Sequence, residues 1–434
     1  MSKKNIRWLA AELPKFVERK LISQDQQHAI LDYYRQEKGG RPNVAIIAFS
    51  IFGAVLLAAG IILILAHNWS NLSRPARTVL SFFPLVIGQS IGFWVLFRHS
   101  RSIAWREGIA AFAFLAVGST IALISQTYHI QGELKTFLLT WIILALPLAY
   151  VFSSTTATVL YLAGISTWAV AARTADSSAL AYWLLLIAIL PMFLVKNTGK
   201  AHPKQTTIIG WFISLSLIAG VSVGHSSITE GFRTISFISM FLILYMLGSL
   251  FDTGRSIWSN PFHRVGILGL AVTCLFLSYR DTWDNLSYHA VKTYGRSLEI
   301  TAGDWIVSIA LPILAAILTG LAVWRKNRVA PAMAAGLPLA LLGFAFTGSS
   351  AGRAVFTAIF NAYVFAGGVA CMAWGIKTNE GKIVNFGFAL AAAVIVLRFF
   401  DSDLSFVLRG IIFVILGAGF LSTNVFIARR RAAQ

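Results

Sequence analysis

"VAIIAFSIFGAVLLAAGIILILA", residues 44–66, is the stretch that decides the fold class of this chain. It contains no charged residue. It is also longer than the roughly 20 apolar residues that an α-helix needs to cross the hydrocarbon core of a bilayer. The stretch therefore predicts a membrane-spanning helix.

The composition extends this prediction to the whole chain. Of the 434 residues, 57% are hydrophobic and only 12% are charged, and the mean hydropathy is +0.72. A soluble domain has about 25% charged residues, so this chain has too little polar surface to cover a globule. The net charge of +19 would indicate a nucleic-acid partner in a soluble protein. Here it is explained by basic residues in the cytoplasmic loops of a membrane protein, and we expect no nucleic-acid partner.

The hydropathy pattern predicts an all-α fold, a polytopic transmembrane helical bundle of about 14 spans. Several spans are close to the lower limit of about 17 residues. Their approximate limits are 44–66, 79–97, 108–126, 136–152, 155–172, 178–195, 206–224, 234–251, 264–279, 305–324, 332–348, 353–375, 382–399 and 404–427.

Three regions are predicted: a cytoplasmic helical module at 1–42, a transmembrane domain at 43–428 and a basic tail at 429–434. In the module, Ser23 and Gln26 have the spacing of a capping box, in which each side chain satisfies a free backbone N–H group. No apolar stretch follows the first basic residues, so the N-terminus is not a signal peptide.

The distribution of basic residues predicts the orientation. With the N-terminus in the cytoplasm, 25 of the 36 Lys and Arg residues lie inside, 10 lie outside and Arg409 lies within the last span. This asymmetry follows the positive-inside rule, and it places both termini in the cytoplasm. Cys274 and Cys371 lie in apolar runs and resemble small core residues. No motif predicts a metal site or a cofactor.

Several motifs in the first 150 residues resemble one bacterial family. They are "LIS" in the N-terminal module, then "LAHNWSNLSRPAR", "WREG" and "ALISQTYHIQGEL". Near the other end, "LRFFDSDLSFVLRGIIFVILGAGF" resembles the C-terminal part of such proteins. The family is a set of multi-pass inner-membrane proteins catalogued as domain of unknown function 2157. The resemblance implies a bacterial inner-membrane location, and it carries no established reaction, ligand or catalytic residue.

The stretch "SQTYHIQGELKT" places hydrogen-bonding side chains at the outer end of the third span. If the helix continued to Glu133, then His129 and Glu133 would share one face at i,i+4, close to Gln126 and Tyr128. Such a pair is suited to a proton relay, half of a metal site or a polar headgroup. The alternative is a polar helix end that meets water. Gly132 favours this alternative, because glycine commonly ends a helix.

A second polar group follows the first span. His67 directly follows the apolar run of the first span, and Arg74 and Arg77 lie a few residues further on. Paired guanidinium groups near a membrane surface are suited to phosphate. The alternative is interfacial anchoring, in which the arginines extend toward lipid headgroups.

The end of the chain supplies a third group. Arg409 lies inside the last span, where a charge is costly and usually faces the bundle. Arg398, Asp401 and Asp403 lie just before it, at the outer face. This group predicts either structural ion pairing or the handling of a substrate or protons. Asp304, near the start of the tenth span, is explained by helix capping, and the alternative is a catalytic acid.

Other polar and aromatic residues favour structural roles. Gln89, Asn361 and Asn385 lie within spans, where such residues usually bond to neighbouring helices. The outer loop at 280–304 is predicted to lie at the membrane interface, with Trp283 at the level of the headgroups.

Three functions remain open. The first is a transporter or flippase-like protein for an amphipathic, anionic substrate at the periplasmic side. In it, His129 and Glu133 bind substrate or relay protons, while Arg409 holds an anionic group with Asp401 as counter-charge. The second is a membrane enzyme acting on lipid-linked substrates, with His129 or Asp304 as base, although the sequence has no Walker A, HExxH or CxxC motif and its one GxSxG match, at 348–352, lies in a turn between two spans. The third is a non-catalytic scaffold that binds an envelope protein. Membrane lipids are the expected partners in all three.

Overall fold

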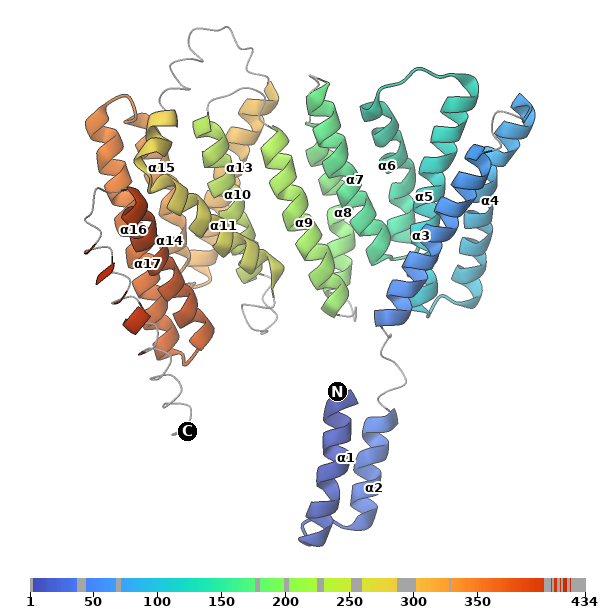
Figure 1. Cartoon of the computed structure of the whole chain (residues 1–434), viewed down its shortest axis with the longest axis horizontal. Helices are drawn as coiled ribbons and strands as arrows, with labels where there is room; N and C mark the ends of the chain where they lie inside the picture. The colour runs from blue at the N-terminus through green and yellow to red at the C-terminus, as the bar shows by residue number, and fades with distance from the viewer. Residues whose placement is uncertain are drawn as a thin grey trace. The chain divides into compact units, whose positions relative to one another are not determined.

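The computed structural model describes residues 3–36, 44–67, 72–175, 180–198, 203–224, 230–250, 260–286, 302–327 and 329–401, with isolated positions between 407 and 422. These residues form α-helices and no strand, which confirms the all-α class (Figure 1). The helices are α1 (Lys3–Glu18), α2 (Gln24–Gln36), α3 (Val44–His67), α4 (Arg74–Arg98), α5 (Ile103–Tyr128), α6 (Leu134–Val151), α7 (Thr155–Thr174), α8 (Ala181–Thr198), α9 (Pro203–Gly224), α10 (Glu230–Leu250), α11 (Pro261–Leu277), α13 (Ala302–Trp324), α14 (Ala330–Ala334), α15 (Gly336–Ala345), α16 (Ser350–Lys377) and α17 (Gly381–Asp401).

Each predicted span up to residue 399 coincides with a described helix, except that the span predicted at 332–348 is divided into α14 and α15. Among the described residues, nine helices are long and apolar enough to cross a membrane, or up to ten if one bent pair counts as a single span. The number of about 14 spans is therefore not confirmed. The predicted span at 404–427 lies largely outside the described residues.

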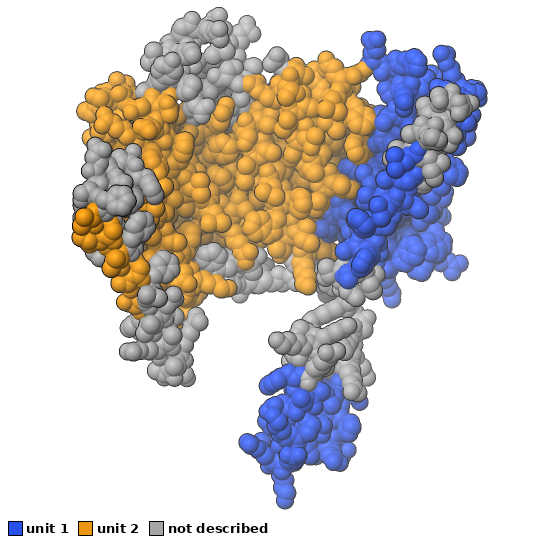
Figure 2. Space-filling model, in the orientation of Figure 1, with its two compact units in different colours: residues 1–131, 144–157 blue, residues 132–143, 158–434 orange. Residues whose placement is uncertain are grey.

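The chain divides into two compact units (Figure 2). Unit 1 comprises residues 1–131 and 144–157, and unit 2 comprises residues 132–143 and 158–434. Helix α6 contributes to both units, because the division falls within it.

The N-terminal module begins its second helix as predicted. Ser23 N–H donates to Gln26 Oε1 at 2.9 Å, and Gln26 N–H donates to Ser23 Oγ at 3.2 Å, so the capping box is confirmed. Helices α1 and α2 pack against each other, and Leu13 is buried.

In unit 1, small residues let helices α4 and α5 approach closely. A Cβ atom on Gly88 would lie 3.3 Å from the ring of Phe112 on α5, and one on Gly92 would lie 3.8 Å from the side chain of Ile109 on α5 and 2.8 Å from the ring of Phe152, which follows α6. Gln89, in contrast, is exposed and makes no hydrogen bond to a neighbouring helix among the described residues. Helix contact in this GxxxG segment therefore depends on glycine rather than on the amide.

In unit 2, helices α16 and α17 make the most extensive contact among the described helices, and they lie side by side in Figure 1. A Cβ atom on Gly387 would lie only 2.5 Å from the backbone oxygen of Gly368. Such a crossing requires glycine on both helices, because a side chain on either would separate the two backbones.

Helix α15 returns the chain to the end of unit 2 at which α16 begins. Gly336, at its start, lies against Tyr363, and Gly343, further along, lies against Phe356. Helix α15 is therefore antiparallel to α16. Short as they are, α14 and α15 connect the far end of α13 to the start of α16.

Candidate functional site

In the described part of unit 2, the chain bends sharply after α11. Helix α11 ends at Leu277, and the short helix Arg280–Leu286 that follows is bent by 83° from it. The end of a helix leaves its last carbonyl groups without intrahelical partners. Away from water each such group is costly unless it accepts a hydrogen bond from elsewhere.

Side chains of the short helix satisfy two of these carbonyl groups. Thr282 Oγ1 donates to the oxygen of Phe276 at 2.8 Å, and Trp283 Nε1 donates to the oxygen of Leu277 at 2.7 Å. Trp283 is completely buried within the protein, and the predicted position at the headgroup level stays a prediction. Its indole fixes the short helix against the core of unit 2.

Two distant helices satisfy the carbonyl group of Ser278, which lies in the break itself. Asn361 of α16 donates to it through Nδ2 at 2.9 Å, and Arg398 of α17 donates to it through its guanidinium group. The Arg398 guanidinium carbon also lies 4.7 Å from the centre of the Tyr279 ring. That distance fits a cation–π contact. The break is thus held by one amide and one positive charge.

The amide of Asn361 is only half satisfied. Its Nδ2 also donates to the oxygen of Thr357 at 2.7 Å. Both partners are carbonyl oxygens, which only accept, so the nitrogen must face them and Oδ1 must point elsewhere. Asn361 Oδ1 is buried and has no hydrogen-bond partner among the described residues. The break therefore has one acceptor that a donor from a ligand or a water molecule could satisfy.

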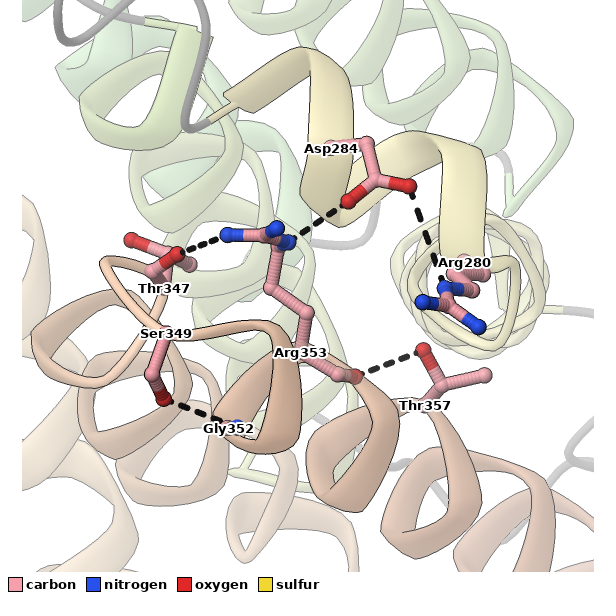
Figure 3. Close-up of polar contacts among 7 residues, drawn as sticks. All are labelled: Arg280, Asp284, Thr347, Ser349, Gly352, Arg353 and Thr357. Carbon is pink, nitrogen blue, oxygen red and sulfur yellow. Dashed lines mark hydrogen bonds and ion pairs between the residues drawn. The ribbon is translucent and has the colours of Figure 1, made fainter.

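An ion pair lies beside the break (Figure 3). Arg353 Nε of α16 lies 2.6 Å from Asp284 Oδ1, and Arg353 Nη1 donates to the oxygen of Thr347 at 2.7 Å. Arg280 Nε lies 3.9 Å from Asp284 Oδ2. Two guanidinium groups thus face one carboxylate.

These contacts agree with the predicted alternation of spans. The alternation puts the end of α11, the start of α16 and the end of α17 on one side of the membrane. Asp284, Arg353 and Arg398 belong to these three ends, and the contacts bring them together around Ser278 and Asp284.

In unit 1, the polar stretch after α5 forms a helix end. Helix α5 ends at Tyr128, and His129 has a left-handed backbone conformation with φ 53°. The His129 Nδ1 atom lies 2.9 Å from the oxygen of Gln126. Helix α6 begins only at Leu134, so no continuous helix places His129 and Glu133 on one face. Glu133 pairs instead with Lys135 at 2.7 Å, and the Glu133 side chain is 64% exposed.

The structure does bring two predicted polar groups of unit 1 next to each other. Tyr128 OH lies 2.9 Å from Thr78 Oγ1, which is one turn beyond Arg74 on α4. Arg74 is exposed, and Arg77 Nε donates to the oxygen of Leu72 at 3.0 Å. The start of α4 and the end of α5 therefore share one polar surface.

The remaining predicted site residues are placed only in part. His67 is the last residue of α3, Asp304 falls within α13 and Asp401 is the last residue of α17, but their side chains lie outside what is described. Arg409 and Asp403 lie outside the described residues altogether. The predicted pairing around Arg409 thus stays a prediction.

The sequence interpretation missed a buried carboxylate in unit 1. Glu107, in the "WREG" motif, is only 3% exposed and accepts hydrogen bonds at the start of α7. The sequence did contain a signal for this burial, because Glu107 is followed directly by a long apolar run. Arg353, at the start of a predicted span, and Asp284, in the predicted outer loop at 280–304, were not singled out, because nothing in the sequence pairs them.

The helices and their apolar lengths define the class of this chain, which is a polytopic α-helical membrane protein. Residues 14–158 match the family described as "Predicted membrane protein (DUF2157)", which confirms the resemblance noted from the N-terminal motifs. The C-terminal stretch from Leu397 to Phe420 lies outside that match. No curated protein and no solved structure matches the chain.

Proposed function

We propose that this protein is an inner-membrane transporter or flippase-like protein that binds an anionic, amphipathic substrate at the periplasmic side. The observation that carries the proposal is the break after α11, where Arg398 and Asn361 converge on the carbonyl group of Ser278. In membrane transporters, discontinuous helices supply the backbone and side-chain groups of substrate sites.

The chemistry of the break supports an anionic substrate. Irregular backbone at membrane depth is tolerated where it is buried in protein or lines a cavity. Here it is accompanied by the guanidinium groups of Arg398 and Arg353 and by the unsatisfied Oδ1 of Asn361. Guanidinium groups recognise phosphate and carboxylate, and Oδ1 can accept from a hydroxyl group of the same molecule.

We place the substrate site on the periplasmic side because basic residues are in excess in the predicted inner loops. That orientation places the ends of α11 and α17, and hence Arg398, at the outer face. The polar surface of Thr78 and Tyr128 in unit 1 falls on the outer side by the same alternation.

A lipid-flipping assay tests the proposal. The full chain is reconstituted into vesicles that contain a trace of fluorescently labelled phosphatidylglycerol, and dithionite is added to bleach the outer leaflet. We expect the label to bleach more completely in vesicles with protein than in empty vesicles. Arg398→Gln and Asn361→Leu should slow the exchange, because each removes a group from the break.

Arg325→Gln is the matched control. Arg325 is also an arginine at the end of a span, but it is exposed and lies just beyond α13. Its replacement should leave the exchange unchanged. If the wild-type protein exchanges neither labelled phosphatidylglycerol nor labelled phosphatidylcholine, the flippase proposal fails and the scaffold role takes its place.

A further inference from the structure

We propose that Arg353 and Arg280 form an oxyanion-binding site that the Asp284 carboxylate occupies in this structure. A phosphate or carboxylate group of a ligand would bind by taking the place of Asp284 on the two guanidinium groups. This inference deepens the proposed function and rests on it for its physiological role, since it names the chemical group by which the substrate is held.

The guanidinium group of Arg353 is oriented by its neighbours. Its Nη1 donates to the oxygen of Thr347, which orients the guanidinium group, and its Nε lies 2.6 Å from Asp284 Oδ1 (Figure 3). A guanidinium group presents five N–H donors in a planar arrangement that matches two oxygens of one anion. Asp284 Oδ1 lies at one edge of this arrangement, which is the position that an oxygen of a bound oxyanion would take in its place.

The local charge also favours an anion. Arg280 and Arg353 both face Asp284, so this group carries one more positive than negative charge. Arg353 lies in the first turn of α16, where the helix dipole is positive and an anion is favoured. Asp281, the other acid of the short helix, is exposed and has no ion pair with either arginine among the described residues. Loss of Asp284 from the group would therefore leave a site with strong positive potential.

A ligand can reach the two arginines, and displacing Asp284 from them costs little. The Asp284 side chain is 44% exposed and that of Arg280 is 59% exposed, so a ligand can reach the pair. Arg353 is less exposed, at 20%, and gives the site a fixed inner wall. The Arg280–Asp284 pair has enough exposure to contribute little to stability, so exchanging this contact for one with another oxyanion is inexpensive.

Binding measurements on the full chain test the inference. The protein in nanodiscs of phosphatidylcholine is titrated by calorimetry with inorganic phosphate and, separately, with short-chain phosphatidylglycerol. Asp284→Asn removes the competing carboxylate and should tighten binding about fivefold, the size of one exposed ion pair. Arg353→Gln should weaken it by about ten- to a hundredfold, because hydrogen bonds to a charged group are lost.

Two further variants keep the test interpretable. Arg280→Gln, at an exposed position, should weaken binding severalfold without any effect on folding. Arg325→Gln should leave binding unchanged. If phosphate and phosphatidylglycerol compete, the site recognises the oxyanion by itself. If only the lipid binds, recognition requires the acyl chains as well as the headgroup.

The inference is overturned if Asp284→Asn fails to tighten binding, or if Arg353→Gln leaves it unchanged while the variant melts like wild type. The failure of the proposed function has a different signature. In that case lipid exchange is missing from the vesicle assay, while the Asp284 and Arg353 variants still alter binding in nanodiscs.

Discussion

Glu107 and Ser154 are 47 residues apart in sequence, and the Ser154 hydroxyl donates to Glu107 Oε2 at 2.5 Å. The backbone N–H groups of Thr155 and Thr156 donate to the same carboxylate at 2.9 and 2.7 Å. A carboxylate from α5 thus caps the start of α7, where free N–H groups and the helix dipole favour a negative charge. Three donors offset the cost of burying this charge, which explains why an acidic residue is tolerated in an apolar helix.

Glu107→Gln should destabilise the protein strongly. The amide can accept only at its oxygen, and its NH₂ group would face N–H donors, so we expect a loss of about 2–4 kcal/mol. Thermal unfolding of the detergent-solubilised protein measures the effect as a lower apparent Tm. Glu133→Gln is the control, because the exposed pair with Lys135 contributes at most about 1 kcal/mol. Equal Tm values for the two variants would contradict the capping role.

Trp283 should prove essential to the short helix after the break. Trp283→Phe keeps most of the ring but leaves the carbonyl group of Leu277 without its donor, at a cost of about 1–3 kcal/mol. Trp283→Ala also creates a cavity beside Phe356 and Phe360, and should cost about 3–5 kcal/mol. The order of the two Tm values is the measurement. A Phe variant as unstable as the Ala variant would mean that ring volume contributes little.

Two glycines on neighbouring helices distinguish close packing from open space. Gly387→Ala would place a Cβ atom 2.5 Å from the oxygen of Gly368, so α16 and α17 must separate, at a cost of about 1–3 kcal/mol. Gly367→Ala has nothing within 4 Å of its new atom and should stabilise slightly or be neutral. Thermal unfolding of both variants tests the crossing, and similar Tm values would argue against it.

The predicted orientation can be tested by labelling single cysteines. With Cys274 and Cys371 replaced by alanine, Asp281→Cys should react with a membrane-impermeant maleimide in intact spheroplasts. Arg325→Cys should react only after lysis, because α13 separates the two positions. Both residues are exposed, so access to the thiol does not limit the reaction. The reverse pattern would put the break after α11 on the cytoplasmic side.

The sequence predicts those structural features of this protein that depend on interactions between residues close together in the chain. The bounds of the long helices follow from apolar runs, and the Ser23–Gln26 cap follows from a local spacing, because both are set by residues close in the chain. The number of spans does not follow from apolar runs in the same way, because Ala48–Leu57, Ala181–Leu194 and Ala330–Ala345 are apolar helices among the described residues that are too short to be counted by length. The burial of Trp283 in the protein was missed for a related reason: its neighbours in sequence are charged, and only its tertiary contacts show that it is buried.

The sequence by itself determined that this chain is an all-α membrane protein, because apolar length and scarcity of charge are properties of composition. Short motifs near the N-terminus also indicated the resemblance to the family whose model matches residues 14–158. Only the tertiary structure decided which polar groups meet. Arg353 reaches Asp284, and Asn361 and Arg398 reach Ser278, across 69, 83 and 120 residues of sequence respectively. No local pattern encodes such pairings, because they arise from how helices pack once each has formed.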